Sequence, residues 1–415
     1  MPTRKDHSPN SKLVLAACAF ILCLLSASRA YANHQNCPKT GCPSRLTTIY
    51  TGANWENFTG PGGLIQDAQG NLYGTTYIGG GSSLGTVFEL SPGPNGSWSE
   101  ADIFTFLSCA STGCIPYPNL AMDSSGSLYG TTEYGGPNNF GTVFKLTLKS
   151  GTWTESTLHS FTPAVAAAPN SLSYWNGLAL NRTTGVLYGP GSNGQIWELV
   201  PGNSGWTFNV IATLSDPAIG GLVIDSSGSL YGTAFGNDHG IIFALYPTYF
   251  GWIPYQLYAF TGGSDGEYPT GNLVLQNTPN WIFNGNVLYG TTSSGGSGGM
   301  GTVFAYKLPT TEFEPGTFGM FHSFSGADGS NLKTVAVDSL GDVYVLAAGG
   351  GTYSDGTIYK ITNYYYFYQG AVLWNFNYCG NDPMGFILGS DGALYGTALM
   401  TGSGCTVEDL AFRFK

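Results

Sequence analysis

Residues 126–146 read GSLYGTTEYGGPNNFGTVFKL, and close copies of this stretch recur along the chain. Its first part alternates in polarity, a glycine-rich segment follows, and Gly141 to Leu146 is rich in β-branched and aromatic residues. Alternation and β-branched residues are typical of strands, whereas clustered glycines are typical of the loops that join them. The stretch therefore predicts two neighbouring strands connected by a loop.

The tetrad Leu-Tyr-Gly-Thr marks each copy of the repeat. It begins at Leu72, Leu128, Leu230, Leu288 and Leu394. Two copies are degenerate, beginning at Leu187 and Val343, and the seven tyrosines are spaced by 56, 59, 43, 58, 55 and 51 residues. Repeats of this length indicate a repeat architecture with about four strands in each unit.

The second unit shows the expected strands best. Leu120 to Met122 and Ser127 to Thr132 flank a turn, a third strand starts at Gly141, and a fourth covers Ser156 to Phe161. Equivalent third strands are predicted to start at Gly85, Gly194, Gly240, Gly301 and Gly356. Seven four-stranded units predict an all-β, seven-bladed β-propeller.

The two ends of the repeat region predict how the ring closes. The last unit has only the divergent third strand Leu410 to Phe414, whereas Leu46 to Tyr50 resembles a fourth strand but precedes the first unit. We expect this N-terminal strand to complete the last blade, which leaves no open sheet edge at the chain ends. The propeller is therefore predicted to cover residues 46–415.

The Tyr-Gly pair inside each second strand predicts a packing contact. Glycine weakens a strand unless another group packs closely over it. We therefore expect a neighbouring Tyr or Phe ring to fill the space above each of these glycines.

Residues 1–32 are typical of an export signal. Basic residues precede the apolar run Leu13 to Leu25, and Ala30-Tyr31-Ala32 is a small-x-small cleavage site. The run is too short for a membrane span of about 20 residues, so we expect no transmembrane span in the mature chain. The protein is predicted to be secreted or periplasmic, with cell-surface association left open.

The charge of the chain bears on its partners. The net charge is −11, and the signal carries net +3, so the mature chain has −14. An acidic surface argues against nucleic-acid binding.

Six cysteines remain after the signal is removed, an even number that predicts three disulfides in an oxidising compartment. Two pairs share the spacing CxxxxC, which favours a disulfide within a single loop. The first pair lies in the segment 33–45 that precedes the propeller. The predicted pairs are Cys37 with Cys42, Cys109 with Cys114, and Cys379 with Cys405.

The composite of a Gly-x-Leu-Tyr-Gly-Thr-Thr strand, a Gly-Gly loop and a Gly-Thr-Val-Phe-x-Leu strand resembles the GloVer repeat of the choice-of-anchor tandem-repeat proteins. Gly70 to Leu90, Gly126 to Leu146 and Gly285 to Tyr306 carry the resemblance best. Cys109 and Cys114 look like a cysteine pair common in that family. The resemblance implies bacterial export and a repeat architecture, with no established activity. Many members continue into an anchoring segment, whereas this sequence ends at Lys415, which puts surface anchoring in doubt.

Propeller ligands usually bind on the face formed by the loops between blades and the loops between second and third strands. Candidate ligand contacts are therefore the aromatic and polar residues of these loops, because rings stack on the apolar faces of sugars while Asp and Asn bond to hydroxyls. They are Trp55, Tyr77, Tyr117, Tyr134, Trp175, Asp238, His239, Asp265, Tyr268, Asp328, Tyr353 and Asp382.

The sequence favours binding over catalysis. No nucleophile and base motif is apparent, no cofactor is predicted, and calcium at Asp265 or Asp328 is a weaker interpretation than a simple Asp-Gly turn. The leading hypothesis is an exported non-catalytic binding or scaffold module for polysaccharide or a protein partner. The alternative is a polysaccharide hydrolase or lyase, which requires carboxylates to converge on the loop face.

Overall fold

A computed structural model describes residues 46–52, 63–165, 177–216, 218–236, 238–278, 285–311, 313–364, 367–376, 381–400 and 408–415. The chain divides into Met1–Arg45 and Leu46–Lys415, and all described residues belong to the second unit. The predicted signal and the cysteines of segment 33–45 lie outside the described residues.

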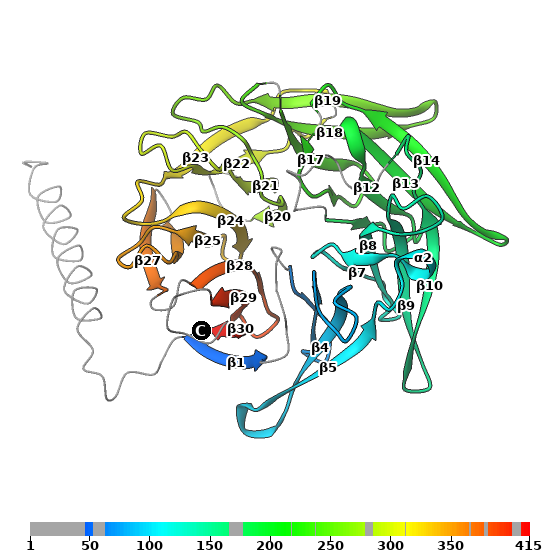
Figure 1. The fold of residues 1–415 in the computed structure, drawn as a ribbon. Coiled ribbons are helices and arrows are strands. Elements are labelled where there is room, and N and C mark those ends of the chain that lie inside the picture. Colours follow the sequence, from blue (N-terminus) through cyan, green and yellow to red (C-terminus); the bar gives the residue numbers. More distant parts are fainter. Residues whose placement is uncertain are drawn as a thin grey trace, which may run out of the picture. The chain divides into compact units, whose positions relative to one another are not determined.

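The described residues form seven antiparallel sheets arranged as blades around a centre (Figure 1). Blades 1 to 3 consist of β2 (Ile65–Gln66), β3 (Leu72–Thr76), β4 (Thr86–Pro92) and β5 (Trp98–Thr105); β6 (Cys114–Pro116) with β7 (Ala121–Met122), β8 (Leu128–Tyr134), β9 (Thr142–Lys149) and β10 (Thr152–Ser160); and β11 (Ala179–Leu180), β12 (Leu187–Pro190), β13 (Gln195–Gly202) and β14 (Gly205–Thr213). Blades 4 and 5 consist of β15 (Ala218–Ile219) with β16 (Val223–Ile224), β17 (Leu230–Phe235), β18 (Ile241–Thr248) and β19 (Gly251–Ala259); and β20 (Val274–Thr278), β21 (Gly285–Thr291), β22 (Thr302–Lys307) and β23 (Thr317–Ser323). Blades 6 and 7 consist of β24 (Ser330–Val337), β25 (Val343–Gly349), β26 (Thr357–Tyr364) and β27 (Phe367–Asn375); and β28 (Asn381–Leu388), β29 (Leu394–Met400), β30 (Glu408–Phe414) and β1 (Leu46–Gly52).

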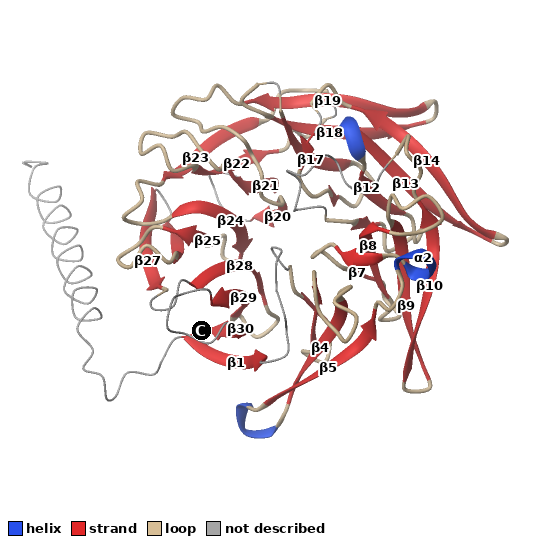
Figure 2. Ribbon diagram, in the orientation of Figure 1, coloured by secondary structure: helices blue, strands red, loops and turns tan. Residues whose placement is uncertain are grey.

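The predicted seven-bladed architecture is confirmed. Every blade has four strand positions, and in blades 2 and 4 the first strand is broken into two pieces. Helix in the described chain is limited to short segments (Figure 2). These are η1 (Pro94–Gly96), α2 (Cys109–Thr112) and η2 (Ser192–Gly194).

The N-terminal strand closes the ring as predicted. β1 pairs antiparallel with β30, with Leu46 opposite Phe414 and a β-bulge between Thr48 and Tyr50. The sheet order β1-β30-β29-β28 places the start of the propeller on the outer edge of the last blade (Figure 1).

The glycine of the repeated tetrad faces a buried ring. Gly130 in β8 lies opposite Phe144 in β9, and a Cβ added to Gly130 would lie 2.4 Å from Cζ of that ring. Blade 3 has Trp197 in the same role opposite Gly189. The predicted ring contact is therefore confirmed, and the ring comes from the third strand.

The tyrosine of the tetrad fixes the turn between the first and second strands. In blade 2, Oδ1 of Asp123 accepts hydrogen bonds from the amides of Ser125 and Ser127, and its Oδ2 accepts one from the hydroxyl of Tyr129 at 2.9 Å. The same Asp and Tyr pair recurs in blades 1, 4, 6 and 7. In these five blades the tyrosine of the tetrad therefore stabilises the turn that joins the first two strands.

The hydrophobic core lies between adjacent blades. One cluster joins Tyr73 and Val87 of blade 1 to Leu128 and Phe144 of blade 2, and another joins residues of blade 1 to Tyr395 of blade 7. Because each blade buries its apolar faces against both neighbours, the sheets support one another around the ring.

Candidate functional site

The loop face, as we use the term, consists of the loops between blades and the loops between second and third strands. In blade 2, the amide of Thr142 donates to Oγ1 of Thr132, and Oγ1 of Thr142 donates to the carbonyl of Thr112 in the preceding inter-blade loop. A Cβ on Gly113 would lie 2.2 Å from Oγ1 of Thr132, so the loop can approach this closely only with glycine there. Blade 5 repeats the arrangement with Thr292, Thr302, Asp265 and Gly266.

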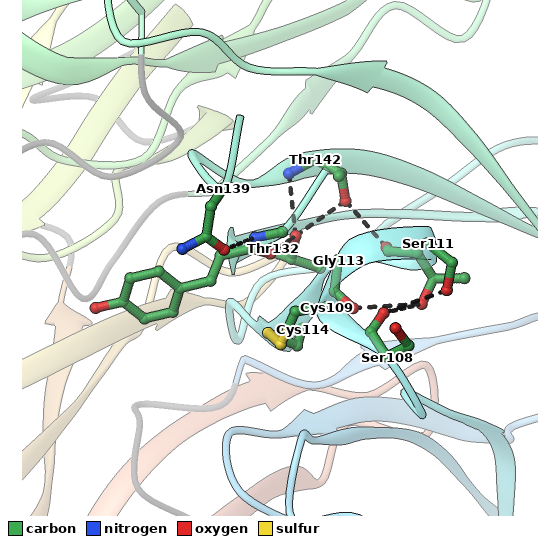
Figure 3. The surroundings of a disulfide bond; sticks show 11 residues. Ser108, Cys109, Ser111, Gly113, Cys114, Thr132, Asn139 and Thr142 are labelled. Atoms are coloured by element: carbon green, nitrogen blue, oxygen red, sulfur yellow. Dashed lines mark hydrogen bonds between the residues drawn. A yellow bond between two sulfur atoms is a disulfide. The ribbon is translucent and has the colours of Figure 1, made fainter. Parts of the chain in front are cut away.

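A disulfide closes the loop between blades 1 and 2. Cys109, the first residue of α2, bonds to Cys114 with their Cα atoms 4.7 Å apart, beside Gly113 and the Thr132–Thr142 pair (Figure 3). The predicted pair Cys109–Cys114 is thus confirmed. Cys37, Cys42, Cys379 and Cys405 lie outside the described residues.

Asp265 holds the equivalent loop between blades 4 and 5. Its Oδ2 accepts hydrogen bonds from the hydroxyl of Tyr258 and the amide of Thr261, both at 2.9 Å, and its Oδ1 accepts one from the Thr261 hydroxyl. Burial raises the pKa of Asp265, but these hydrogen bonds outweigh it and leave the pKa below its ordinary value. Only 9% of the residue is exposed. Asp265, predicted as a ligand contact, is therefore a loop-holding residue.

Asp328 holds the loop between blades 5 and 6 in a similar way. Its Oδ2 lies 2.6 Å from Nε2 of His322, and its Oδ1 accepts a hydrogen bond from the amide of Ser325. The His322 ring stacks on Tyr359. Burial raises the pKa of Asp328, and the bonds from Ser325 and His322 bring it below the ordinary value. The two carboxylates that the sequence singled out thus serve different loops.

The loop face carries a Tyr-Glu-Tyr group over blades 1 and 2. The hydroxyl of Tyr77 donates to Oε2 of Glu133 at 2.5 Å. A hydrogen bond to Glu133 also raises the pKa of Tyr134, whose side chain is 43% exposed. Glu133 was not predicted, although it stands four residues after Tyr129 as Tyr77 stands four after Tyr73, and aligning the repeats would have revealed it.

A second polar group lies over blades 4 and 5. Nδ1 of His239 is 2.9 Å from Oε2 of Glu267, and the amide of Tyr268 donates to the carbonyl of His239. Tyr268 has φ +54°, which a bulky residue rarely adopts, and is 39% exposed. Asp238 is exposed beside His239. His239, Tyr268 and Asp238 therefore all lie on the loop face as predicted.

The other candidates fall into four groups. Tyr353 is 53% exposed in the loop between β25 and β26. Tyr117 is only 5% exposed, because its ring packs with the core between blades 2 and 3, so its predicted place on the ligand surface is wrong. Asp382 lies in β28 opposite Leu399 and not in a loop. Trp55 and Trp175 lie outside the described residues.

A cavity of about 300 Å³ is lined by residues of the first strands and of the segments that precede them. Its walls are mainly apolar side chains of blades 5 to 7, including Val335 and Phe386, with Asn119, Asn272 and Lys333 as polar lining residues. The amide of Gly221 donates to Oδ1 of Asn272. Asn119 and Asn272 precede a leucine where blades 1, 3 and 4 have Gly-Leu, so the sequence already shows this difference.

A cation site is not evident in this part of the chain: among the described residues, no group of three or more His, Cys, Asp or Glu side chains could hold a metal ion. Nor does any described helix have the length and apolar character needed to cross a membrane.

Comparison with known proteins supports the repeat and the fold. The profile of the Gloeobacter/Verrucomicrobia repeat matches residues 39–191 and 179–407. A search of curated proteins gave no match.

The solved structures with similar folds are propellers of unrelated functions. One is an extracellular domain ascribed to a hybrid two component system of B. thetaiotaomicron, with a TM-score of 0.55 and 13% identity over 88% of this chain. This chain covers 39% of that one. A chain of a mitotic checkpoint complex has a TM-score of 0.54 and 14% identity, covering 92% of this chain and 96% of its own. A protein from Lactobacillus plantarum has a TM-score of 0.52 and 14% identity, covering 79% and 88%. At such identities the similarity shows the fold alone.

Proposed function

Because this chain belongs to the Gloeobacter/Verrucomicrobia repeat family and is a seven-bladed β-propeller, we propose that it is an exported, non-catalytic module that binds polysaccharide on its loop face. Export is supported by the signal-like residues 1–32 and by the Cys109–Cys114 disulfide, since such bonds persist in oxidising compartments.

The observation that carries the proposal is the exposure of three tyrosines on one face. Tyr134, Tyr268 and Tyr353 are 43%, 39% and 53% exposed. Tyr134 is the last residue of β8, and Tyr268 and Tyr353 lie in two different loops. A tyrosine ring offers an apolar surface for stacking and a hydroxyl for hydrogen bonding, which suits a ligand that presents both kinds of group. Polysaccharides present such faces at regular intervals, so separate loops can contact one extended chain.

Neighbouring polar groups add hydrogen-bonding capacity. Glu133 lies beside Tyr134, and His239 with Glu267 lies beside Tyr268. These side chains can bond to sugar hydroxyls whose apolar faces stack on the rings.

The hydrolase or lyase alternative has less support. Glycoside hydrolysis requires two carboxylates roughly 5 to 10 Å apart and open to substrate. Asp265 and Asp328 are each engaged by residues of their own loops, and Asp265 is almost buried. We therefore propose that these two carboxylates stabilise the loops that contain them.

Binding of the mature protein to a glycan array and to insoluble polysaccharides tests the proposal. We expect Tyr134→Ala, Tyr268→Ala and Tyr353→Ala each to lower the affinity for the glycan roughly 5- to 10-fold. This corresponds to about 1 to 1.5 kcal/mol for the loss of one aromatic contact. Ser150→Ala, in the turn between β9 and β10 at the opposite end of the strands, is the matched control and should leave affinity unchanged. No binding to any glycan, or binding that the three tyrosine variants leave intact, would contradict the proposal. Release of shorter oligosaccharides would favour the enzyme alternative.

A further inference from the structure

The turn that joins β18 to β19 in blade 4 presents two aromatic side chains to solvent. Tyr249 and Phe250 form the tip between Thr248 and Gly251, which pair with each other. Both side chains are 96% exposed, and their rings contact each other edge to face with centroids 5.2 Å apart. Figure 1 shows β19 at the outer rim of the ring. These are the largest exposed fractions among the large hydrophobic side chains that the structure describes, and apolar residues that are exposed side by side mark a contact site more often than single ones.

The turn geometry does not require aromatic residues. In blade 3 the same two-residue connection, between Gly202 and Gly205, holds Asn203 and Ser204. Small polar residues of this kind are the usual choice in tight hairpins. In blade 4 the bonds of the turn come from Thr248, whose Oγ1 accepts from the amide of Phe250 and donates to the carbonyl of Gly251. The two rings therefore serve something other than the turn.

The hairpin also lacks charge. The sequence from Gly240 to Ser264 contains no Asp, Glu, Lys, Arg or His. The other hairpins of third and fourth strands each carry charged residues, namely Glu89, Lys145, Glu198, Lys307, Lys360 and Arg413. A charged side chain is costly to remove from water, so the blade 4 hairpin, which is uncharged along its whole length, can contact an apolar environment without that penalty.

Apolar exposure continues from the tip along one side of the hairpin. Ile253 is 42% exposed, and Phe313 from the next blade is 44% exposed. Phe313 contacts the rings of Tyr246 and Tyr255, and the hydroxyl of Tyr255 donates to its carbonyl. We call Tyr249, Phe250, Ile253 and Phe313 the blade-4 tip.

We propose that the blade-4 tip inserts into the interfacial region of a lipid bilayer. A stable protein interface or a second copy of this chain needs about 800 Å² on each side with matching shape, whereas a two-residue turn is small and convex. A fluid bilayer adapts to the shape of the side chains that enter it, so no complementary surface is needed, and aromatic side chains are favoured at its interface. The acidic mature chain, with net charge −14, favours zwitterionic over anionic lipid.

The topology gives this contact a definite orientation. Turns between third and fourth strands lie at the opposite end of the strands from the loop face, because antiparallel strands alternate in direction. A propeller held by the blade-4 tip therefore turns Tyr134, Tyr268 and Tyr353 away from the lipid surface, where a ligand can reach them. The membrane contact does not depend on the identity of that ligand.

Flotation of the mature protein with phosphatidylcholine vesicles tests the proposal. The variant Tyr249→Asn with Phe250→Ser copies the blade 3 turn, so it keeps a known hairpin geometry, and an unchanged melting temperature confirms that it folds. We expect the vesicle partition coefficient to fall about tenfold or more, and the bound fraction of wild type to be insensitive to salt. The converse variant, Asn203→Tyr with Ser204→Phe, should bind vesicles more tightly than wild type.

Two outcomes would overturn the proposal. One is wild-type protein that does not float with phosphatidylcholine vesicles. The other is equal flotation of wild type and the Tyr249→Asn, Phe250→Ser variant. Loss of a specific protein partner in that variant, without vesicle binding by wild type, would assign the tip to a protein interface instead. Glycan binding by the variant should be unchanged, which separates this proposal from the proposed function.

Discussion

Replacement of Gly130 by alanine tests the packing that repeats in nearly every blade. A Cβ at this position would lie 2.4 Å from Cζ of Phe144 and 2.9 Å from Cδ2 of Leu120. Carbon atoms pack at about 3.5 to 4.0 Å, so the ring must move by about 1 Å. It cannot move freely, because Phe144 is fully buried and its ring contacts Phe106 at 5.4 Å between centroids.

The expected cost follows from two opposing effects. Overpacking in a closely packed core costs about 1 to 3 kcal/mol. Alanine recovers about 0.5 to 1 kcal/mol, because glycine loses more backbone freedom on folding. Because a Cβ would lie only 2.4 Å from the Phe144 ring, the overpacking cost lies in the upper part of its range, about 2 to 3 kcal/mol. We therefore expect Gly130→Ala to lower the free energy of unfolding by about 1 to 2.5 kcal/mol, measured by urea denaturation with an unchanged m-value.

Two further variants make the test specific. Gly81→Ala is the control, because nothing lies within 4 Å of a Cβ there and its effect should stay within about 0.5 kcal/mol. Phe144→Leu removes the clashing ring atoms, so combining it with Gly130→Ala should cost less than the two single changes added together. A neutral Gly130→Ala, or strict additivity in the double variant, would refute the reasoning.

Three other predictions concern the ring and the loop face. Deletion of residues 33–52 should lower the melting temperature and promote self-association, because β30 becomes an open edge; an unchanged melting temperature contradicts ring closure by β1. Replacing Cys109 and Cys114 together by serine should lower the free energy of unfolding by about 2 kcal/mol, since the loop that the disulfide closes is short. An unchanged thermal unfolding curve would show that the disulfide does not stabilise the loop. Because the pKa values of Asp265 and Asp328 are lowered in the folded state, their contribution to stability is present above about pH 4 and is lost as pH falls through the folded values. Asp328→Asn should make urea stability less dependent on pH between about pH 5 and pH 3, and a slope equal to that of wild type would contradict the assignment.

The fold could be predicted from the sequence because the sequence of each blade can be compared with those of six other blades. The third strands were placed by glycines such as Gly85 and Gly356, and each begins one residue later in the structure. Ring closure by Leu46 to Tyr50 followed from a missing strand in the last unit, which required no knowledge of side-chain packing.

The candidate site was harder to predict because exposure and hydrogen-bond partners depend on the three-dimensional path of each loop. Tyr117 and Tyr134 are the same residue type in the same blade, yet one packs into the core and the other faces solvent. Asp328 is an acceptor for His322 of β23, a contact that no motif in the sequence indicates. Glu133 could have been identified by aligning equivalent positions of adjacent blades.

The pairing of β1 with β30 sets an order of events during synthesis. Leu46 is synthesised before all seven blades are complete and Phe414 only with the last blade, so the two pairing partners are made roughly 20 to 70 seconds apart at about 5 to 20 residues per second. Among the strand pairings that the structure describes, this one joins the residues farthest apart in sequence, and such contacts form slowly because a large loop must close first. Blades 1 to 6 can therefore assemble as an open arc, and the last blade converts that arc into a ring in one late step. A chain interrupted before β30 would keep both a free strand and an open sheet edge, which is the condition under which identical chains exchange strands.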